Sequence, residues 1–207
     1  MPVSQAQLIP TKLALRRTLK AQRSGRSPGD HDQAGQAIAA VGLELPRLRR
    51  ADCVAVYASL PEEPGTALLR TGLRELGIRV LLPIVGDDPD TRLLDWAEDN
   101  GELVAAGALR LPEPTGPRFG PAEIAKAQVI LVPALAVDTT GTRLGRGGGY
   151  YDTALTRADP HALLLALVHD REVLDADTTP IPREPHDIGV HGVITPTRWM
   201  FFRPVPD

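Results

Sequence analysis

Cysteine and long apolar runs are scarce in this sequence, and each scarcity excludes a class of protein. The 207 residues include one cysteine, Cys53, which rules out an intramolecular disulfide framework and is consistent with a reducing cytoplasm. No run of about 18 or more apolar residues occurs, and no apolar signal region precedes the first helical pattern. We therefore expect a cytoplasmic protein with no membrane span and no secretory signal.

An excess of basic residues is also missing. The formal net charge of -3 argues against a general nucleic-acid binder, so any basic site must be local. The hydrophobic content of 43% and the charged content of 24% are those of an ordinary globular protein, and the length suits one well-buried domain. We expect a single domain over residues 1–207, a monomer with small-molecule substrates, and neither nucleic-acid nor membrane partners.

Apolar spacing predicts helices that alternate with strands. Helices are predicted over residues 12–23, 32–43, 66–76, 121–127 and 150–158, and strands over residues 53–57, 78–82, 129–138, 162–168 and 189–194. We expect Pro10 in the first turn of the first helix and Thr66 as the N-cap of the third. The stretch 83–121 is rich in Pro, Gly and Asp, and we interpret it as an antiparallel excursion or a ligand-facing lobe.

This alternation is typical of an α/β fold. We expect a three-layer sandwich with a mostly parallel, Rossmann-like central sheet, similar to the sheets of sugar-phosphate isomerases and CoA transferases. Ligands of such sheets bind at the carboxyl ends of the strands. The glycine-rich segment 141–152 directly follows the apolar run 129–138, so we expect it at that edge of the sheet.

The segment 141–152 combines five glycines with two arginines, two tyrosines and one aspartate. Glycine is favoured where the backbone must reach positive φ or approach a ligand closely. Glycine N–H groups and the guanidinium groups of Arg143 and Arg146 together suit a phosphate. Asp152 is interpreted either as an Mg²⁺ ligand or as the cap of its own helix. Tyr150 and Tyr151 either hold a ring or phosphate of a ligand, or anchor the next helix in the core.

Two common nucleotide-binding motifs do not fit this segment. A Walker A loop has its second glycine at the sixth position, which counted from Gly141 is Arg146. A dinucleotide fingerprint that starts at Gly145 would place its last glycine at Tyr150. A P-loop and a standard NAD site are therefore disfavoured, and the phosphate interpretation depends on the local charges.

Residues 143–152, Arg-Leu-Gly-Arg-Gly-Gly-Gly-Tyr-Tyr-Asp, are similar to the signature of the 5-formyltetrahydrofolate cyclo-ligase family, also called 5,10-methenyltetrahydrofolate synthetase. Four further segments resemble the family in order and spacing. They are residues 12–16 (its N-terminal Lys-x-x-x-Arg helix), 59–66 (its Pro-x-Glu-x-x-Thr loop), 132–138 (its Val-Pro-Gly-Leu-Ala-Phe-Asp strand) and 185–187 (its late His-Asp pair). The resemblance covers nearly the whole chain.

The resemblance implies an ATP- and Mg²⁺-dependent ligase of one-carbon metabolism. Such an enzyme converts 5-formyltetrahydrofolate to 5,10-methenyltetrahydrofolate and releases ADP and phosphate. In the family's proposed mechanism the formyl oxygen attacks the γ-phosphate, N10 attacks the activated carbon, and phosphate leaves as the ring closes. Phosphoryl transfer asks the protein chiefly for positioning and charge neutralisation.

The resemblance also implies roles for individual residues. Lys12 and Arg143 are expected to be catalytic, and Asp152 and Asp187 to bind Mg²⁺. Glu63 is expected to hydrogen-bond the pterin of the substrate, with Tyr151 and Trp96 as further substrate contacts. The expected ATP site consists of Lys12, Arg16, Arg143, Leu144, Gly145, Arg146, Gly147, Gly148, Gly149, Tyr150 and Tyr151.

Some of these residues have an ordinary structural alternative. Lys12 and Arg16 could form a solvated helix face, which is the usual meaning of basic residues at that spacing. Trp96 could simply pack in the core. The family often has Tyr, Lys or Met at the position of Arg146, so the resemblance supports a phosphate role for Arg143 more than for Arg146.

Two other functions are the alternatives to a ligase. One is a protein that binds nucleotide or folate without turnover; it is disfavoured by the presence of Lys12, Glu63, Asp152 and Asp187. The other is a sugar-phosphate isomerase or CoA transferase on a similar sheet. Those enzymes need a catalytic base at a strand end and no ATP. No residue of the sequence indicates such a base as clearly as the glycine segment indicates phosphate binding.

Overall fold

The computed structural model describes residues 11–86, 89–106 and 110–206, so the expectation for Pro10 lies outside the described residues. Its centre is a seven-stranded sheet in the order β12-β11-β9-β6-β1-β2-β3. The strands are β1 (Cys53–Ala55), β2 (Arg79–Val85), β3 (Leu94–Glu98), β6 (Val129–Pro133), β9 (Leu163–Leu167), β11 (Gly192–Ile194) and β12 (Trp199–Phe201). Neighbours from β11 to β2 run parallel, and only the edge strands β3 and β12 are antiparallel. The expected mostly parallel α/β sheet is confirmed.

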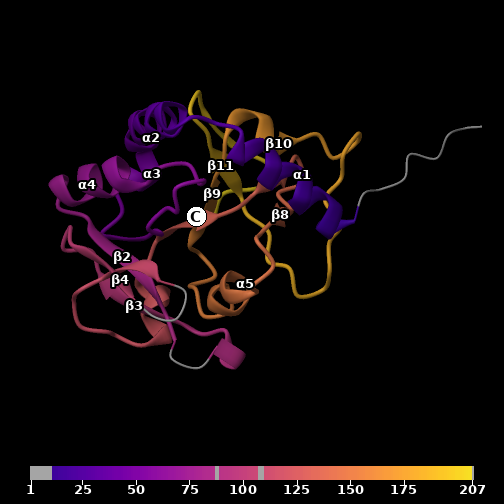
Figure 1. Ribbon diagram of the computed structural model, residues 1–207. Coiled ribbons are helices and arrows are strands. Elements are labelled where there is room, and N and C mark those ends of the chain that lie inside the picture. The colour runs from indigo at the N-terminus through magenta and orange to yellow at the C-terminus, as the bar shows by residue number, and fades with distance from the viewer. Residues whose placement is uncertain (1–10, 87–88, 107–109, 207) are drawn as a thin grey trace, which may run out of the picture.

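Helices cover both faces of this sheet. Successive strand side chains point to opposite faces, so Val54 packs in one hydrophobic cluster while the neighbouring Cys53 and Ala55 pack in another. The first cluster lies under α2 (Pro28–Leu43), α3 (Pro46–Arg49) and α4 (Ala67–Glu75), which Figure 1 shows grouped together. The second lies under α5 (Tyr150–Leu155) and the 3₁₀ helix η2 (Pro121–Lys126). Buried Cys53 is part of a strand, as predicted.

Local capping moves some helix ends away from the predicted positions. Helix α2 begins four residues early because Ser27 and Asp30 form a reciprocal capping box with Pro28 in the first turn. Thr66 does precede α4, but its hydroxyl donates to the carbonyl of Tyr57 at 2.7 Å and does not cap the helix. Helix α5 ends at Leu155, short of the predicted residue 158.

The apolar run 129–138 is not one strand. It divides into β6 and β7 (Ala136–Asp138), and β7 belongs to a separate three-stranded sheet with β8 (Arg143–Leu144) and β10 (Val173–Leu174). Pro133 has no N–H to donate and ends β6. Leu135 then donates its N–H to the carbonyl of Leu144 at 2.7 Å. The uniformly apolar sequence hid this break because both strands are buried.

Helix α1 (Lys12–Ser24) lies apart from the other helices, beside β8 and β10 (Figure 1). Leu15 and Leu19 pack against Leu135 and Leu144 in a third hydrophobic cluster. Near its end, the fully buried Arg23 makes two 2.8 Å hydrogen bonds to Glu172. Leu15 and Leu19 thus hold the first half of α1, which carries the predicted basic residues, and Arg23 holds its end.

The stretch 83–121 forms the antiparallel excursion that its composition indicated. Strand β2 turns through the 3₁₀ helix η1 (Pro89–Thr91) into antiparallel β3. The hairpin of β4 (Leu103–Ala106) and β5 (Leu111–Pro114) follows. The carboxylate of Glu113 accepts the N–H of Val85 at 3.0 Å, which holds the hairpin against β2. Within the described ranges, no helix has the length and apolar character required to cross a membrane.

Candidate ligand-binding cleft

A cleft of about 1020 Å³ opens at the carboxyl ends of the central strands. Tyr57 follows β1, Val85 ends β2 and Pro133 ends β6, and all three line it. The first turns of α1, the loop 145–149, the start of α5 and the segment 182–187 supply further walls. The expectation that a ligand site lies at this edge of the sheet agrees with the position of the cleft.

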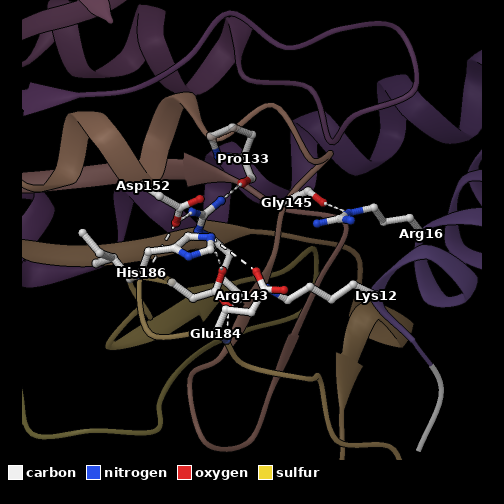
Figure 2. Close-up of polar contacts among 10 residues, drawn as sticks. Lys12, Arg16, Pro133, Arg143, Gly145, Asp152, Glu184 and His186 are labelled. Atoms are coloured by element: carbon white, nitrogen blue, oxygen red, sulfur yellow. Dashed lines mark hydrogen bonds and ion pairs between the residues drawn. The ribbon is translucent and has the colours of Figure 1, made fainter. Parts of the chain in front are cut away.

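The glycine loop joins β8 to α5 and needs glycine at defined positions. Gly147 has φ of 103° and Gly149 has φ of 76°, in the region that L side chains rarely adopt. A side chain at Gly147 would also meet the guanidinium of Arg16, whose Cζ would lie 3.5 Å from the added Cβ. The Nε of Arg16 donates to the carbonyl of Gly145 at 2.9 Å (Figure 2), so α1 and the loop are joined directly.

Lys12 stands at the cleft in contact with two acids. Its Nζ lies 2.6 Å from Asp187 Oδ2 and 3.1 Å from Glu184 Oε2. Burial acts to lower the pKa of Lys12, but the hydrogen bonds to Asp187 and Glu184 outweigh it, so the pKa is raised. For Asp187 burial acts to raise the pKa, but the hydrogen bonds from Lys12 and from the N–H of Glu184, together with the charge of Lys12, outweigh it and the pKa is lowered. Both groups are therefore charged at neutral pH.

Arg143 is buried between the end of β6 and the start of α5. Its Nη2 donates to Asp152 Oδ1 at 2.7 Å, and its Nη1 lies 3.5 Å from the carbonyl oxygen of Pro133 (Figure 2). The Nε of Arg143 has no hydrogen-bond partner within the described part of the chain. Asp152 also lies 3.4 Å from the N–H of Ile188, which places it next to the segment that holds Asp187.

Arg146 contacts the loop that follows β1. Its Nη1 lies 3.3 Å from Glu63 Oε1, and its Nη2 lies 3.6 Å from Glu62 Oε2. Arg146 is more exposed than Glu63, whose side chain is buried and whose Oε2 accepts the N–H of Leu60 at 3.0 Å. Glu63 therefore has a fixed position in the cleft, while Arg146 is held by one long contact on each of two acids.

A group of possible metal ligands lies beside Lys12. Among the described residues, ligand atoms of Glu184, His186 and Asp187 lie within 4.8 Å of one another. Figure 2 shows the His186 ring next to the Glu184 carboxylate, and the His186 Nε2 to Glu184 Oε2 distance is 3.3 Å. Asp152 is not in this group. Carboxylate oxygens suit Mg²⁺. Asp187 therefore has a second carboxylate beside it, that of Glu184, which the sequence analysis did not assign to the site.

Two expected ligand contacts are not at the cleft surface. Trp96 is fully buried in the cluster under α5 and does not line the cleft, so the packing alternative fits its position. Leu144 is also fully buried, and its side chain packs against α1. Arg143, which precedes Leu144 in β8, does line the cleft, because successive side chains of a strand point to opposite faces. The glycines of the loop 145–149 have no side chain and line the cleft with their backbone.

Sequence reasoning missed several residues that line the cleft. Tyr57 and Glu184 were not assigned to it, nor was Arg92 or the hairpin strand β5. Glu184 lies within the His-Asp segment, so its position next to Pro185 was an available signal. Tyr57 ends the predicted strand 53–57 at the carboxyl edge, where a polar side chain also could have been noted. The interpretation of residues 83–121 as an antiparallel excursion or a ligand-facing lobe did not specify which residues would meet a ligand; in the structure Leu111, Pro112 and Glu113 of β5 line the cleft.

Comparison with known proteins gives concordant matches. A model of the 5-formyltetrahydrofolate cyclo-ligase family matches residues 9–196. The chain is 43% identical over 147 residues to the 5-formyltetrahydrofolate cyclo-ligase of Mycolicibacterium smegmatis, covering 70% of this chain and 74% of that protein. It is 26% identical over 181 residues to the Escherichia coli protein of the same name, covering 87% and 97%. The NMR structure of Aquifex aeolicus 5,10-methenyltetrahydrofolate synthetase has the same fold, with a TM-score of 0.77, 24% identity and 95% of each chain covered.

Proposed function

The chain belongs to the 5-formyltetrahydrofolate cyclo-ligase family, and from this premise we propose that it converts 5-formyltetrahydrofolate to 5,10-methenyltetrahydrofolate. ATP is the co-substrate, and ADP and phosphate are released. The observation that carries the proposal is the charge pattern of the cleft. Three of its cations are each paired with acids: Lys12 with Asp187 and Glu184, Arg143 with Asp152, and Arg146 with Glu63.

These pairs suit a ligand that carries both phosphate and Mg²⁺. Phosphate oxygens would accept hydrogen bonds from the lysine and arginine side chains. The carboxylates that lose these partners would then be free to bind Mg²⁺. A ligand with only negative charge would satisfy the cations and repel the acids. We assign the triphosphate to Lys12, Arg16, Arg143, Arg146 and the glycine loop.

The residues present fit an Mg²⁺ ion, because the carboxylate oxygens of Glu184 and Asp187 lie close together beside Lys12, and Asp152 lies next to the same segment through its contact with the N–H of Ile188. Asp152 and Asp187 are the proposed ligands, with Glu184 and His186 as neighbours of Asp187. Bound Mg²⁺ supplies charge neutralisation between phosphate groups. Asp152 also orients Arg143 through their 2.7 Å contact, so its carboxylate has a role in positioning as well.

The proposed reaction proceeds in two steps within the cleft. The formyl oxygen attacks the γ-phosphorus as the bond to the ADP oxygen breaks, and Lys12 and Arg143 stabilise the charge on the transferred group. N10 then attacks the formyl carbon, loses its proton, and phosphate leaves with the former formyl oxygen. Glu63 holds the pterin by accepting hydrogen bonds from its ring N–H and amino groups, and Tyr151 contacts the same substrate.

The proposal extends to the state of the protein in the cell. We propose one catalytic domain over residues 1–207, acting as a monomer in the cytoplasm, with small molecules as its substrates.

The test is to mix the purified protein with 5-formyltetrahydrofolate, ATP and Mg²⁺ and to follow the near-ultraviolet absorbance of the methenyl product. We expect a rise that requires all three components. Glu63→Ala should weaken folate turnover while nucleotide binding is retained, and Glu75→Ala, at an exposed position of α4, is the matched control. An absorbance that stays flat with wild-type protein would rule out the ligase, and equal loss of folate and nucleotide binding in Glu63→Ala would contradict its assignment.

A further inference from the structure

Three buried polar atoms that have no partner among the described residues belong to residues that line the cleft. In the described ranges such atoms include the hydroxyls of Tyr57 and Tyr151 and the Nε of Arg143, and these three residues line the cleft. Buried hydroxyls in folded proteins are nearly always hydrogen-bonded. A hydroxyl that has no protein partner and belongs to a cleft-lining residue is a group that a ligand can satisfy.

Tyr57 is placed and held by the fold. It follows β1 at the carboxyl edge of the sheet and is 4% exposed. Its carbonyl accepts the hydroxyl of Thr66 at 2.7 Å, which fixes its backbone. Its ring packs in the cluster under α2 and α4, with Tyr151 against that cluster from the side of the cleft. The ring thus has apolar neighbours that a phenylalanine would satisfy equally well, so packing does not account for the hydroxyl.

Charge around the phenol keeps it a donor. Burial raises the pKa of Tyr57 well above its ordinary value, and the negative charge of Glu63 adds to this effect. Tyr151 is shifted in the same direction, by burial first and by Glu63 second. Both phenols therefore keep their proton at any physiological pH, and the negative charge of Glu63 acts on both.

The pterin edge has a donor and acceptor pattern that matches this arrangement. Its ring N–H and amino group are donors, and they are flanked by acceptors, the 4-oxo oxygen and a ring nitrogen. A carboxylate such as that of Glu63 can take the two donors, but it repels the flanking acceptors. A neutral hydroxyl next to the carboxylate supplies the donor that those acceptors need.

We propose that Tyr57 is a specificity-determining residue of the ligase, which donates its hydroxyl to an acceptor that flanks the pterin N–H groups held by Glu63. The proposal rests on the proposed function, because it assumes the folate substrate. It adds a residue to the substrate site and explains why a buried hydroxyl is kept without a partner. A site with a hydroxyl donor discriminates against ring systems that present a donor at that position.

Arg23 is the competing partner for this hydroxyl. Its charge also acts on the phenol of Tyr57, and its own Nη1 is buried without a partner in the described part of the chain. If the hydroxyl serves the Arg23 and Glu172 network, for instance through a buried water, its loss would lower stability and leave substrate binding unchanged.

Tyr57→Phe separates these roles. We expect the melting temperature to stay the same or rise, because an unsatisfied buried hydroxyl is removed. The KM for 5-formyltetrahydrofolate should rise roughly tenfold, while the KM for ATP changes by less than about twofold. Thr66→Val is the matched control for stability, since it deletes a buried hydroxyl that does have a partner and should lower the melting temperature.

Direct binding keeps this test independent of turnover. The rise in melting temperature caused by 5-formyltetrahydrofolate should be smaller in Tyr57→Phe than in wild type, even if no product forms. If wild-type protein binds 5-formyltetrahydrofolate but shows no ATP-dependent turnover, the proposed ligase activity is refuted. The role of Tyr57 is then decided by the ligand-induced shift in melting temperature alone. An unchanged KM and an unchanged ligand-induced shift in Tyr57→Phe would overturn the assignment, as would a lower melting temperature with intact substrate binding.

Discussion

Arg146 and Glu63 contact each other across the cleft, with Arg146 Nη1 3.3 Å from Glu63 Oε1. The residue that we assign to phosphate thus holds the residue that we assign to the pterin. Each ligand must weaken this contact when it binds, because phosphate competes for the guanidinium and the pterin competes for the carboxylate. The two ligand sites are consequently linked through a single ion pair.

Arg146→Gln should therefore change the two Michaelis constants in opposite directions. The KM for ATP should rise a few-fold because one cation is lost, and the KM for 5-formyltetrahydrofolate should fall slightly because Glu63 is released. Steady-state kinetics with each substrate varied in turn measures both constants. Arg157→Gln, an exposed arginine of the chain that does not line the cleft, is the control. A rise in both constants would show that the contact does not compete with substrate.

Asp152→Asn should reduce kcat by about 100-fold or more, because the variant keeps the shape of the side chain but removes the charge that faces Arg143 and the proposed Mg²⁺. The Mg²⁺ concentration that gives half-maximal rate should also rise. A magnesium titration of the initial rate measures both effects, with Asp159→Asn as the control outside the cleft. A lower kcat with an unchanged Mg²⁺ requirement would leave Asp152 as a positioning residue only.

Glu172→Gln should destabilise the protein by about 3–5 kcal/mol, because it leaves the buried guanidinium of Arg23 without its counter-charge. Urea denaturation gives the free energy of unfolding. The matched control is Glu44→Gln, since Glu44 lies 3.9 Å from Arg49 in an exposed pair that should contribute little. Similar losses in the two variants would contradict this difference between buried and exposed pairs.

His169 should make stability depend on pH between about 6.5 and 4. Burial lowers its pKa to about 4, so the unfolded chain binds a proton in this interval while the folded chain does not. Its contribution is complete above about pH 6.5 and is lost as the pH falls toward 4, which amounts to about 3 kcal/mol. His169→Gln should flatten the free energy of unfolding over this range. The exposed His161→Gln should leave the slope unchanged, and an equal slope in all three proteins would refute the assignment.

The sequence was most informative where one physical rule acts locally. Short apolar runs predicted the five parallel strands and helical spacing of apolar residues predicted most helices, because burial of those side chains decides the structure. The spacing of Lys12 and Arg16 placed both on one face of α1, and both do line the cleft. The glycine loop was recognisable because positive φ at Gly147 and Gly149 restricts the residue type.

The rest depended on contacts between distant segments. Trp96 has the same local sequence whether it packs in the core or faces a ligand, and the packing of α5 and η2 against β3 decides between these. The pairing of Lys12 with Asp187 joins residues that are 175 positions apart, so no local pattern could predict it. The break between β6 and β7 was missed because both strands are buried, and a buried strand has no alternation that would mark its end.

The break between β6 and β7, at residues 133–135, determines which mutations this segment of the chain can accept. Arg23 Nη2 donates to the carbonyl of Ala134 at 2.6 Å, and Arg143 Nη1 lies near the carbonyl of Pro133. Both arginines therefore contact main-chain oxygens, which every residue type provides. Small side chains can be exchanged at position 134 with both contacts retained, as in the Ala that stands here for the family's common Gly. Insertion or deletion of one residue would displace both carbonyls together, so we expect lineages to vary in residue type at this point and to keep the same length.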